Sequence, residues 1–339
     1  MVKLKKGVTE TNIQNFGKTF GLKALKPAEF FSFSRKRGFF FWGFFVLCAL
    51  VVSLLPYRQV VEVKIQKEQV LGQATEQLPV VADYRPVLKP AVENFQISSE
   101  AAFALDLKTG TVLYQKNADM VWPTASLAKL VTALVAVQTV SLDEVITVSD
   151  AGLRVPQPLM GLVPGEKISV RNLLSGMLIM SANDAASSLA LGVASSTPRF
   201  AELMNAMVEK LQLQNTHFRN PVGLDAEGQF STAEDLSRIA VEFLRNPFFA
   251  ETVQTQNKVV ASEDGRISHW LKTSNKLLSE SGVLGVKTGY TDTARGNLII
   301  LGQDRENHQI LTVVLGSDKR EADSRELLNW IFEAYRFAD

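Results

Sequence analysis

The stretch that decides the fold is AAFALDLKTGTVLYQKNADMVWPTASLAKLVTALVAV, residues 101–137. Its first seven residues are mostly apolar and predict a strand, the Lys-Thr-Gly of residues 108–110 is typical of a turn, and residues 111–117 predict the returning strand of a hairpin. Residues 127–137 are apolar on nearly all sides, which predicts a buried helix just after Ser126. The sequence therefore predicts a hairpin followed by a buried helix.

Further elements are predicted towards the C-terminus. Helical patterns cover residues 170–180, 184–194, 199–211, 235–244 and 325–337, and strand patterns cover residues 297–302 and 309–316. Pro198 and the Ser231-Thr232 pair suit the first turns of two of these helices. Strands at both ends with helices between them indicate an α+β fold, in which an antiparallel sheet of distant segments is flanked by helices and carries an inserted all-helical block.

A charge-free apolar run, FFFWGFFVLCALVVSLL, occupies residues 39–55. As a helix its 17 residues would be about 25 Å long, near the lower limit for a transmembrane span. Residues 1–38 hold nine Lys and Arg against two Glu, so the positive-inside rule predicts a basic cytoplasmic head before a transmembrane anchor. A cleaved signal peptide is the alternative, but the apolar core is longer than usual and no Ala-x-Ala-like site follows.

The predicted anchor sets the organisation of the chain. Residues 56–97 mix charges with four prolines and show no sustained period, which predicts an extracytoplasmic stem. Residues 98–339 form the predicted compact domain. The sequence therefore predicts a single-pass protein of the cytoplasmic membrane, with its N-terminus inside and its domain on the outer, periplasmic or cell-wall, side.

Composition excludes several classes of function. The net charge of +1 is not that of a nucleic-acid-binding protein. The single cysteine, Cys48, allows neither an internal disulfide nor a cysteine-based zinc site. The three histidines, His217, His269 and His308, stand in no context that resembles a Ser-His-Asp arrangement or a His-Glu-x-x-His helix. We therefore expect no metal and no cofactor, and a serine enzyme here would need lysine as its base.

The first chemical motif is Ser126-Leu127-Ala128-Lys129. Residues three apart on a helix share a face, so Lys129 is expected beside Ser126. A lysine can take the proton of a serine hydroxyl only in its neutral form, which burial and nearby positive charge favour. At a helix start, Ser126 also places backbone N–H groups where an oxyanion would form. Alone, however, this spacing is also typical of a cap serine and a surface lysine.

Two further motifs follow in the chain. Ser181-Ala182-Asn183 lies between two predicted helices, where it can offer a hydroxyl and an amide, although an ordinary helix cap has the same pattern. Lys287-Thr288-Gly289 lies in a predicted strand, where glycine permits close approach to the backbone. A second Lys-Thr-Gly at residues 108–110 precedes the serine and lies in a hairpin, so it is interpreted as a turn.

With three motifs in this order, the chain resembles the penicillin-recognising serine D,D-peptidases, and most closely the D-alanyl-D-alanine carboxypeptidases among the low-molecular-mass penicillin-binding proteins. The resemblance extends over residues 98–339 and includes the residues that flank each motif. The matching stretches are residues 105–134, 173–190, 218–240 and 273–292. The resemblance implies a β-lactamase/transpeptidase-like fold, a peptidoglycan stem peptide as substrate, a role in cell-wall biosynthesis, and β-lactams as inhibitors.

The resemblance also implies catalytic roles. Ser126 resembles the nucleophile that forms the acyl-enzyme, Lys129 its general base, and Ser181 the proton relay. The backbone N–H groups of Ser126 and Tyr290 would form the oxyanion hole.

Substrate contacts are implied in the same way. Asn183 resembles the clamp on the substrate amide, and Lys287 and Thr288 the contacts to the terminal carboxylate. Gly289 would keep the strand open to the substrate. Arg320 is similar to a carboxylate-binding arginine of the family.

The sequence departs from the family pattern in two places. Arg295 stands where the family usually has glycine, which raises the question of how the backbone is shaped there. Ala128 stands where threonine is common, and we expect that position to tolerate the change.

Three alternatives share part of this pattern. A D,D-endopeptidase would use the same residues to cut crosslinks. A class A β-lactamase would need a deacylating Glu-x-x-Leu-Asn segment, and residues 202–205, Glu-Leu-Met-Asn, lack its spacing. An inactive wall-binding protein would not need all three motifs.

Overall fold

A computed structural model of the 339-residue chain describes residues 85–90 and 95–337. The predicted head (1–38), the predicted anchor (39–55) and residues 56–84 of the predicted stem lie outside the described residues. Among the residues that are described, no helix has the length and apolar character needed to cross a bilayer.

The centre of the domain is a five-stranded antiparallel sheet with the strand order β3-β2-β10-β9-β8. Its strands are β2 (Ala101–Asp106), β3 (Val112–Lys116), β8 (Val283–Thr291), β9 (Arg295–Gln303) and β10 (Gln309–Ser317). The two N-terminal strands thus pair with three strands from the far end of the chain. The predicted hairpin and the sheet of distant segments are confirmed.

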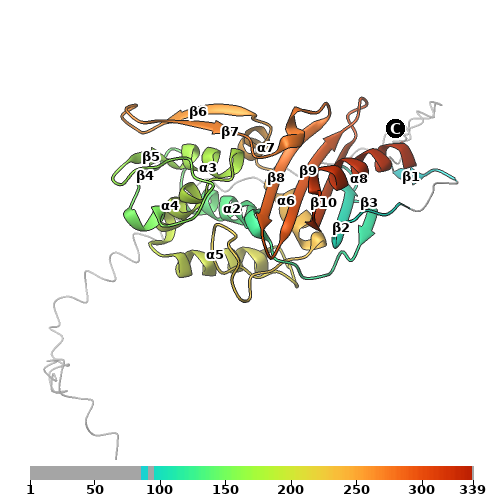
Figure 1. The fold of residues 1–339 in the computed structure, drawn as a ribbon, viewed down its shortest axis with the longest axis horizontal. Coiled ribbons are helices and arrows are strands. Elements are labelled where there is room, and N and C mark those ends of the chain that lie inside the picture. Colours follow the sequence, from blue (N-terminus) through green and yellow to red (C-terminus); the bar gives the residue numbers. More distant parts are fainter. Residues whose placement is uncertain (1–84, 91–94, 338–339) are drawn as a thin grey trace, which may run out of the picture. The chain divides into compact units, whose positions relative to one another are not determined.

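Both faces of this sheet are buried. Successive side chains of a strand point to opposite faces, so each strand contributes to two separate cores. On one face, Ala102, Leu298 and Ile300 pack with α8 (Arg320–Ala334). On the other, Phe103, Ile299 and Leu301 join the core of the helical block. Figure 1 shows α8 beside β9 and β10, and the helices α3, α4 and α5 in the green and yellow part of the chain.

The helical block lies between β3 and β8 in the sequence. Its α-helices are α2 (Lys129–Thr139), α3 (Val170–Ile179), α4 (Asn183–Ala194), α5 (Thr197–Lys210), α6 (Ala233–Leu244) and α7 (Pro247–Val253). The 3₁₀-helices are η1 (Ala125–Ala128) and η2 (Asp150–Leu153) within the block and η3 (Lys276–Ser279) just before β8. Five of the predicted helices are found within two residues of their expected starts. Pro198 lies in the first turn of α5 and Thr232 caps α6, as predicted, and Ser196 caps α5, which was not predicted.

Two small two-stranded sheets were not predicted from the sequence. They are β4 (Val145–Thr147) with β5 (Lys167–Ser169), and β6 (Asn257–Ala261) with β7 (Ser268–Lys272). Their strands are short and pair only with each other, so neither has the long apolar alternation that marks the central sheet.

The C-terminal helix differs from its prediction. It begins at Arg320, five residues earlier than expected, and ends at Ala334 because Tyr335 is extended, with ψ 149°. Tyr335–Phe337 then forms β11, which pairs antiparallel with β1 (Pro86–Leu88). The folded domain therefore includes a strand from within the range 56–97 that was predicted as a stem.

Candidate active site

Ser126 and Lys129 meet at the junction of two helices. Ser126 lies in η1, and Lys129 is the first residue of α2. The Lys129 side chain is completely buried, and its Nζ lies 2.7 Å from each of Ser126 Oγ, Asn183 Oδ1 and the Val222 carbonyl oxygen. The structure thus brings together the two residues of the first motif and the asparagine of the second.

Burial lowers the pKa of Lys129 well below its ordinary value of 10.5, and the positive charge of Lys287 lowers it further. A neutral amine has two N–H groups and one lone pair. The carbonyl oxygens of Asn183 and Val222 can only accept, so they take the two N–H groups. In that neutral form the lone pair faces Ser126 Oγ, 2.7 Å away, in position to accept the hydroxyl proton. A hydroxyl beside a buried amine is chemically able to act as a nucleophile with a general base.

The second motif lies in the turn between α3 and α4. Ser181 has a φ of 66°, a left-handed conformation that turns the chain before Asn183 opens α4. Ser181 Oγ accepts a hydrogen bond of 2.7 Å from Lys287 Nζ. Each active-site lysine therefore holds one serine hydroxyl, and Asn183 lies against Lys129.

Lys287, Thr288 and Gly289 lie on β8, the edge strand of the sheet, as the sequence predicted. A side-chain carbon at Gly289 would lie 3.1 Å from Ala125 Cβ and 3.2 Å from the backbone nitrogen of Ser126. A side chain at this position would therefore be crowded by η1, which approaches the strand closely. That approach also brings the backbone nitrogen of Ser126 next to the strand segment that leads into Tyr290.

Positive charge gathers on this strand. Lys287 is buried, which lowers its pKa to about 7, and the charge of Arg320 contributes to the same shift. Arg320, at the start of α8, donates from Nη1 to the Gly289 carbonyl oxygen at 2.6 Å. Two cationic groups therefore flank the Lys-Thr-Gly backbone, as expected of a site for a carboxylate.

Two participants were not identified from the sequence. Ser274 Oγ forms a hydrogen bond of 2.8 Å with Thr288 Oγ1, and its backbone nitrogen donates to the Ile179 carbonyl oxygen at 2.9 Å. Val222 contributes the carbonyl oxygen that Lys129 contacts. A serine in a loop and a backbone carbonyl carry no chemical pattern of their own, and only the fold brings them to the motifs.

Arg295 shows how the departure from glycine is accommodated. Its φ is 54°, the left-handed region that favours glycine. The guanidinium binds the Glu100 carboxylate at 2.6 Å and the Gly316 carbonyl oxygen, and it lies over the ring of Trp122 at 5.9 Å. These contacts compensate for the strained backbone and direct the side chain towards the start of β2.

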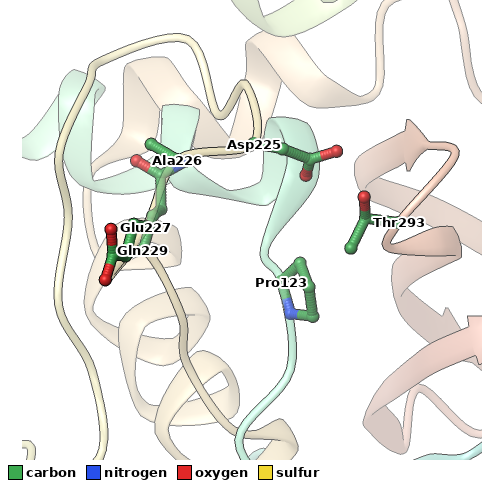
Figure 2. A pocket seen from close by; sticks show the side chains of 6 residues that line it. All are labelled: Pro123, Asp225, Ala226, Glu227, Gln229 and Thr293. Carbon is green, nitrogen blue, oxygen red and sulfur yellow. The ribbon is translucent and has the colours of Figure 1, made fainter.

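A cavity of about 330 Å³ borders the turn that carries the nucleophile. Its lining residues are Pro123, Asp225, Ala226, Glu227, Gln229 and Thr293 (Figure 2). Pro123 lies three residues before Ser126, and Asp225 Oδ1 accepts a hydrogen bond of 2.9 Å from Thr291 Oγ1, next to the end of β8.

The histidines lie elsewhere and contact other groups. His217 Nδ1 lies 2.6 Å from the Gly228 carbonyl oxygen, and His269 Nε2 lies 2.7 Å from the buried Glu166 carboxylate. His308 pairs with Asp304 in the loop between β9 and β10. With Glu306, these two residues form the one group of three possible metal ligands found in residues 85–90 and 95–337. It lies on a different loop from the three motifs.

Comparison with known proteins agrees with this geometry. The D-alanyl-D-alanine carboxypeptidase family matches residues 88–319. The D-alanyl-D-alanine carboxypeptidase DacF of Bacillus subtilis is 30% identical over 246 residues, 70% of this chain and 63% of its own. DacA of Escherichia coli K12 is 31% identical over 255 residues, 71% of this chain and 62% of its own. The chain thus spans less than two thirds of the length of these relatives.

Two other relatives are matched over more of their length. A D-alanyl-D-alanine endopeptidase of Pseudomonas aeruginosa is 31% identical, over 70% of this chain and 78% of its own. The crystal structure of the Streptomyces K15 DD-transpeptidase superposes with a TM-score of 0.67 at 31% identity and covers 71% of this chain and all of its own. The transpeptidase-like fold is thereby confirmed for the described domain, and the chain belongs to the D-alanyl-D-alanine carboxypeptidase family.

Proposed function

We propose that this protein is a serine D-Ala-D-Ala carboxypeptidase that removes the terminal D-alanine from peptidoglycan stem peptides. The observation that carries the proposal is the pair formed by Ser126 and a fully buried Lys129, 2.7 Å apart. Two further motifs converge on this pair, which explains why the chain keeps all three.

In the proposed first step, Lys129 takes the proton of the Ser126 hydroxyl. The freed oxygen forms a bond to the carbonyl carbon of the penultimate D-alanine, and the negative charge that develops on the carbonyl oxygen is bound by the backbone N–H groups of Ser126 and Tyr290. The C–N bond then breaks. Ser181 passes a proton to the leaving nitrogen and regains one from Lys129, which returns Lys129 to its neutral form, and D-alanine departs with its free amino group.

In the second step, water hydrolyses the ester on Ser126. Lys129 takes a proton from the water, and the hydroxide adds to the ester carbonyl. The bond to Ser126 Oγ breaks, and this oxygen takes the proton from Lys129. The products are the shortened stem peptide and free enzyme, and no metal or cofactor takes part in either step.

The terminal carboxylate of the substrate is proposed to bind along β8. Lys287 and Arg320 supply positive charge, and the hydroxyl of Thr288 supplies a hydrogen bond. Asn183 would hold the preceding peptide group. Arg320 already pairs with Glu321 at 3.1 Å, whereas no carboxylate among the described residues pairs with the buried Lys287. A substrate with a free terminal carboxylate would supply that partner, which favours a carboxypeptidase.

The proposal is tested by incubating the purified full chain with a pentapeptide that ends in D-Ala-D-Ala and measuring released D-alanine. Time-dependent release of one equivalent is expected. No release, with intact protein, would favour an inactive wall-binding protein. Rapid turnover of penicillin without peptide cleavage would favour a β-lactamase.

The second candidate function is D,D-endopeptidase activity, which is favoured by the similarity to the D-alanyl-D-alanine endopeptidase of Pseudomonas aeruginosa. The chemistry at Ser126 would be the same, but the leaving amine would belong to a second stem peptide. A crosslinked muropeptide distinguishes the two functions. An endopeptidase would release two uncrosslinked muropeptides, whereas a strict carboxypeptidase would leave the crosslink intact.

The two Lys-Thr-Gly copies provide an internal control for the carboxylate site. Lys287→Ala should lower kcat/KM about 10²-fold or more, roughly 2.7 kcal/mol of transition-state stabilisation, because it removes a sheltered charge that faces the substrate carboxylate. Lys108→Ala should change kcat/KM less than about twofold, since Lys108 is exposed in the turn between β2 and β3. Equal losses in both variants would show that β8 does not line the site.

We further propose that residues 39–55 anchor the protein in the cytoplasmic membrane with the catalytic domain outside. The basic residues before this apolar run support that orientation. In a Cys48→Ser background, a cysteine at Lys108 should react with a membrane-impermeant maleimide on intact cells, and a cysteine at Thr11 should react only after lysis. Labelling at position 11 alone would contradict both the orientation and the wall substrate.

A further inference from the structure

The carboxylate of Asp184 follows the second motif directly and is almost completely buried, with 2% of the residue exposed. Its Oδ1 accepts a hydrogen bond from the backbone nitrogen of Met160 at 2.9 Å. Its Oδ2 accepts from Gly161 at 3.0 Å and from Leu162 at 3.2 Å. A buried carboxylate that binds three successive N–H groups of another segment fixes that segment, because each unmade bond would leave a buried group unsatisfied.

The neighbouring residue, Asn183, holds the other half of the same segment. Its Nδ2 donates to the carbonyl oxygens of Pro156 at 3.0 Å and Gln157 at 3.2 Å, and its backbone nitrogen donates to Pro158 at 2.7 Å. Residues 156–162, which we call the amide-orienting segment, are therefore bound by two consecutive residues at the start of α4.

From the opposite side, a buried pair supports this segment. His269 Nδ1, on β7, lies 3.1 Å from the Met160 carbonyl oxygen, and His269 Nε2 lies 2.7 Å from Glu166 Oε1. Glu166 Oε2 in turn accepts from the backbone nitrogen of Val163 at 3.1 Å. The backbone of Met160 is thus held at both of its polar atoms: Asp184 binds its nitrogen, and His269 contacts its carbonyl oxygen.

The amide-orienting segment determines which way the Asn183 side chain faces. Its Nδ2 group has two hydrogens, and the carbonyl oxygens of Pro156 and Gln157 accept them. This leaves Asn183 Oδ1 directed at Lys129 Nζ, 2.7 Å away. If the segment moved, the amide could rotate and place its NH₂ group against the amine. The Lys129 lone pair would then no longer be held on Ser126.

We propose that Asp184 is a positioning residue for the reaction: it holds the amide-orienting segment, which orients Asn183 and thereby the general base. The inference rests on the proposed function, since it concerns the rate at which Ser126 is acylated. Asp184 lies outside the three motifs. Among the described residues it forms no hydrogen bond with Ser126 or Lys129, so its effect on them is indirect.

The test compares acylation of the full chain by a fluorescent penicillin, with the rate expressed per titratable site so that only folded molecules count. Asp184→Asn keeps the shape of the side chain but replaces an acceptor oxygen by a donor, which opposes the N–H groups of residues 160–162. The limiting acylation rate should fall about 10- to 100-fold. Asp106→Asn is the matched control, because Asp106 is also fully buried and accepts two hydrogen bonds from Thr109 in the turn after β2. It should keep the wild-type rate.

A double-mutant cycle separates positioning from general destabilisation. In an Asn183→Ala background the amide is absent, so adding Asp184→Asn should lower the rate by less than about threefold. A purely structural effect would instead lower the rate by the same factor in both backgrounds, and that result would overturn the inference.

Asp184→Glu keeps both acceptor oxygens and should fold even if Asp184→Asn does not. It should restore part of the rate, because the carboxylate can still bind N–H groups although its longer side chain shifts the segment. If Asp184→Asn and Asp184→Glu both fold and both acylate at the wild-type rate, the positioning role is refuted and the proposed function stands. Absence of labelling in the wild-type protein would refute the proposed function, and the inference with it.

Discussion

Ser126→Ala should abolish D-alanine release, with kcat/KM reduced about 10⁴-fold or more, since losing the nucleophile removes the covalent pathway. The substitution deletes one oxygen atom, and Ala125, Leu127 and Ala128 around it are already buried and apolar. The thermal midpoint should therefore change by only a few degrees. Loss of activity with an intact fold is the result expected when a catalytic nucleophile is replaced.

Ser237→Ala is the control for this variant. Ser237 is also buried, and its hydroxyl donates to the Glu234 carbonyl oxygen at 2.6 Å on α6. Its replacement should leave kcat/KM within about twofold of wild type. Undiminished turnover in Ser126→Ala would contradict the assignment of the nucleophile.

Lys129→Met should slow acylation by about 10²–10⁴-fold, the usual range for a lost general base. Methionine fills much of the space of the lysine. Burial already disfavours the charged form of Lys129, so an apolar side chain of similar volume should not unfold the domain. The measurement is the second-order rate of labelling by a fluorescent penicillin, together with the thermal midpoint.

Lys116→Met is the matched control for Lys129→Met. The Lys116 Nζ also donates to backbone carbonyl oxygens, those of Ile97 at 2.8 Å and Ser99 at 2.6 Å. Lys116 lies on β3, at the far edge of the sheet from β8. The control should lower stability by about 1–2 kcal/mol and leave acylation unchanged. A fast Lys129→Met enzyme would require a different base.

Local patterns were sufficient to predict the elements that carry the motifs. The i, i+3 spacing of Ser126 and Lys129 predicted their contact, and the break between two helical patterns predicted the turn at Ser181. The strand with Lys287 was expected from its motif, and the distinction between the two Lys-Thr-Gly copies followed from their positions in the chain.

The remaining features depend on contacts between distant segments. Neither the burial of Lys129 nor the proximity of Lys287, which together lower its pKa, can be inferred from spacing alone. The same is true of the pair formed by Ser274 and Thr288. It is also true of the contacts of the Asp184 carboxylate with residues 160–162, which lie more than twenty residues away along the chain. The role of a residue outside a recognisable motif can be inferred only from its contacts in the folded structure.

Arg295 illustrates a departure that a motif alone could not explain. The family pattern predicted glycine there, and the structure supplies the physical reason, a left-handed backbone. The compensating contacts to Glu100 and Gly316 come from the strands β2 and β10 and their flanks, which no local pattern identifies. The departure therefore concerns the backbone of β9 rather than the chemistry at Ser126.

The most direct test of the account is mass spectrometry of the protein after exposure to benzylpenicillin. A β-lactam resembles the D-Ala-D-Ala peptide but keeps its leaving group tethered, so hydrolysis of the ester should be slow and the adduct should persist. We predict one added drug molecule, located on the proteolytic peptide that contains Ser126, and no adduct in Ser126→Ala. An adduct on Ser181, or no adduct on intact wild-type protein, would contradict the proposed mechanism.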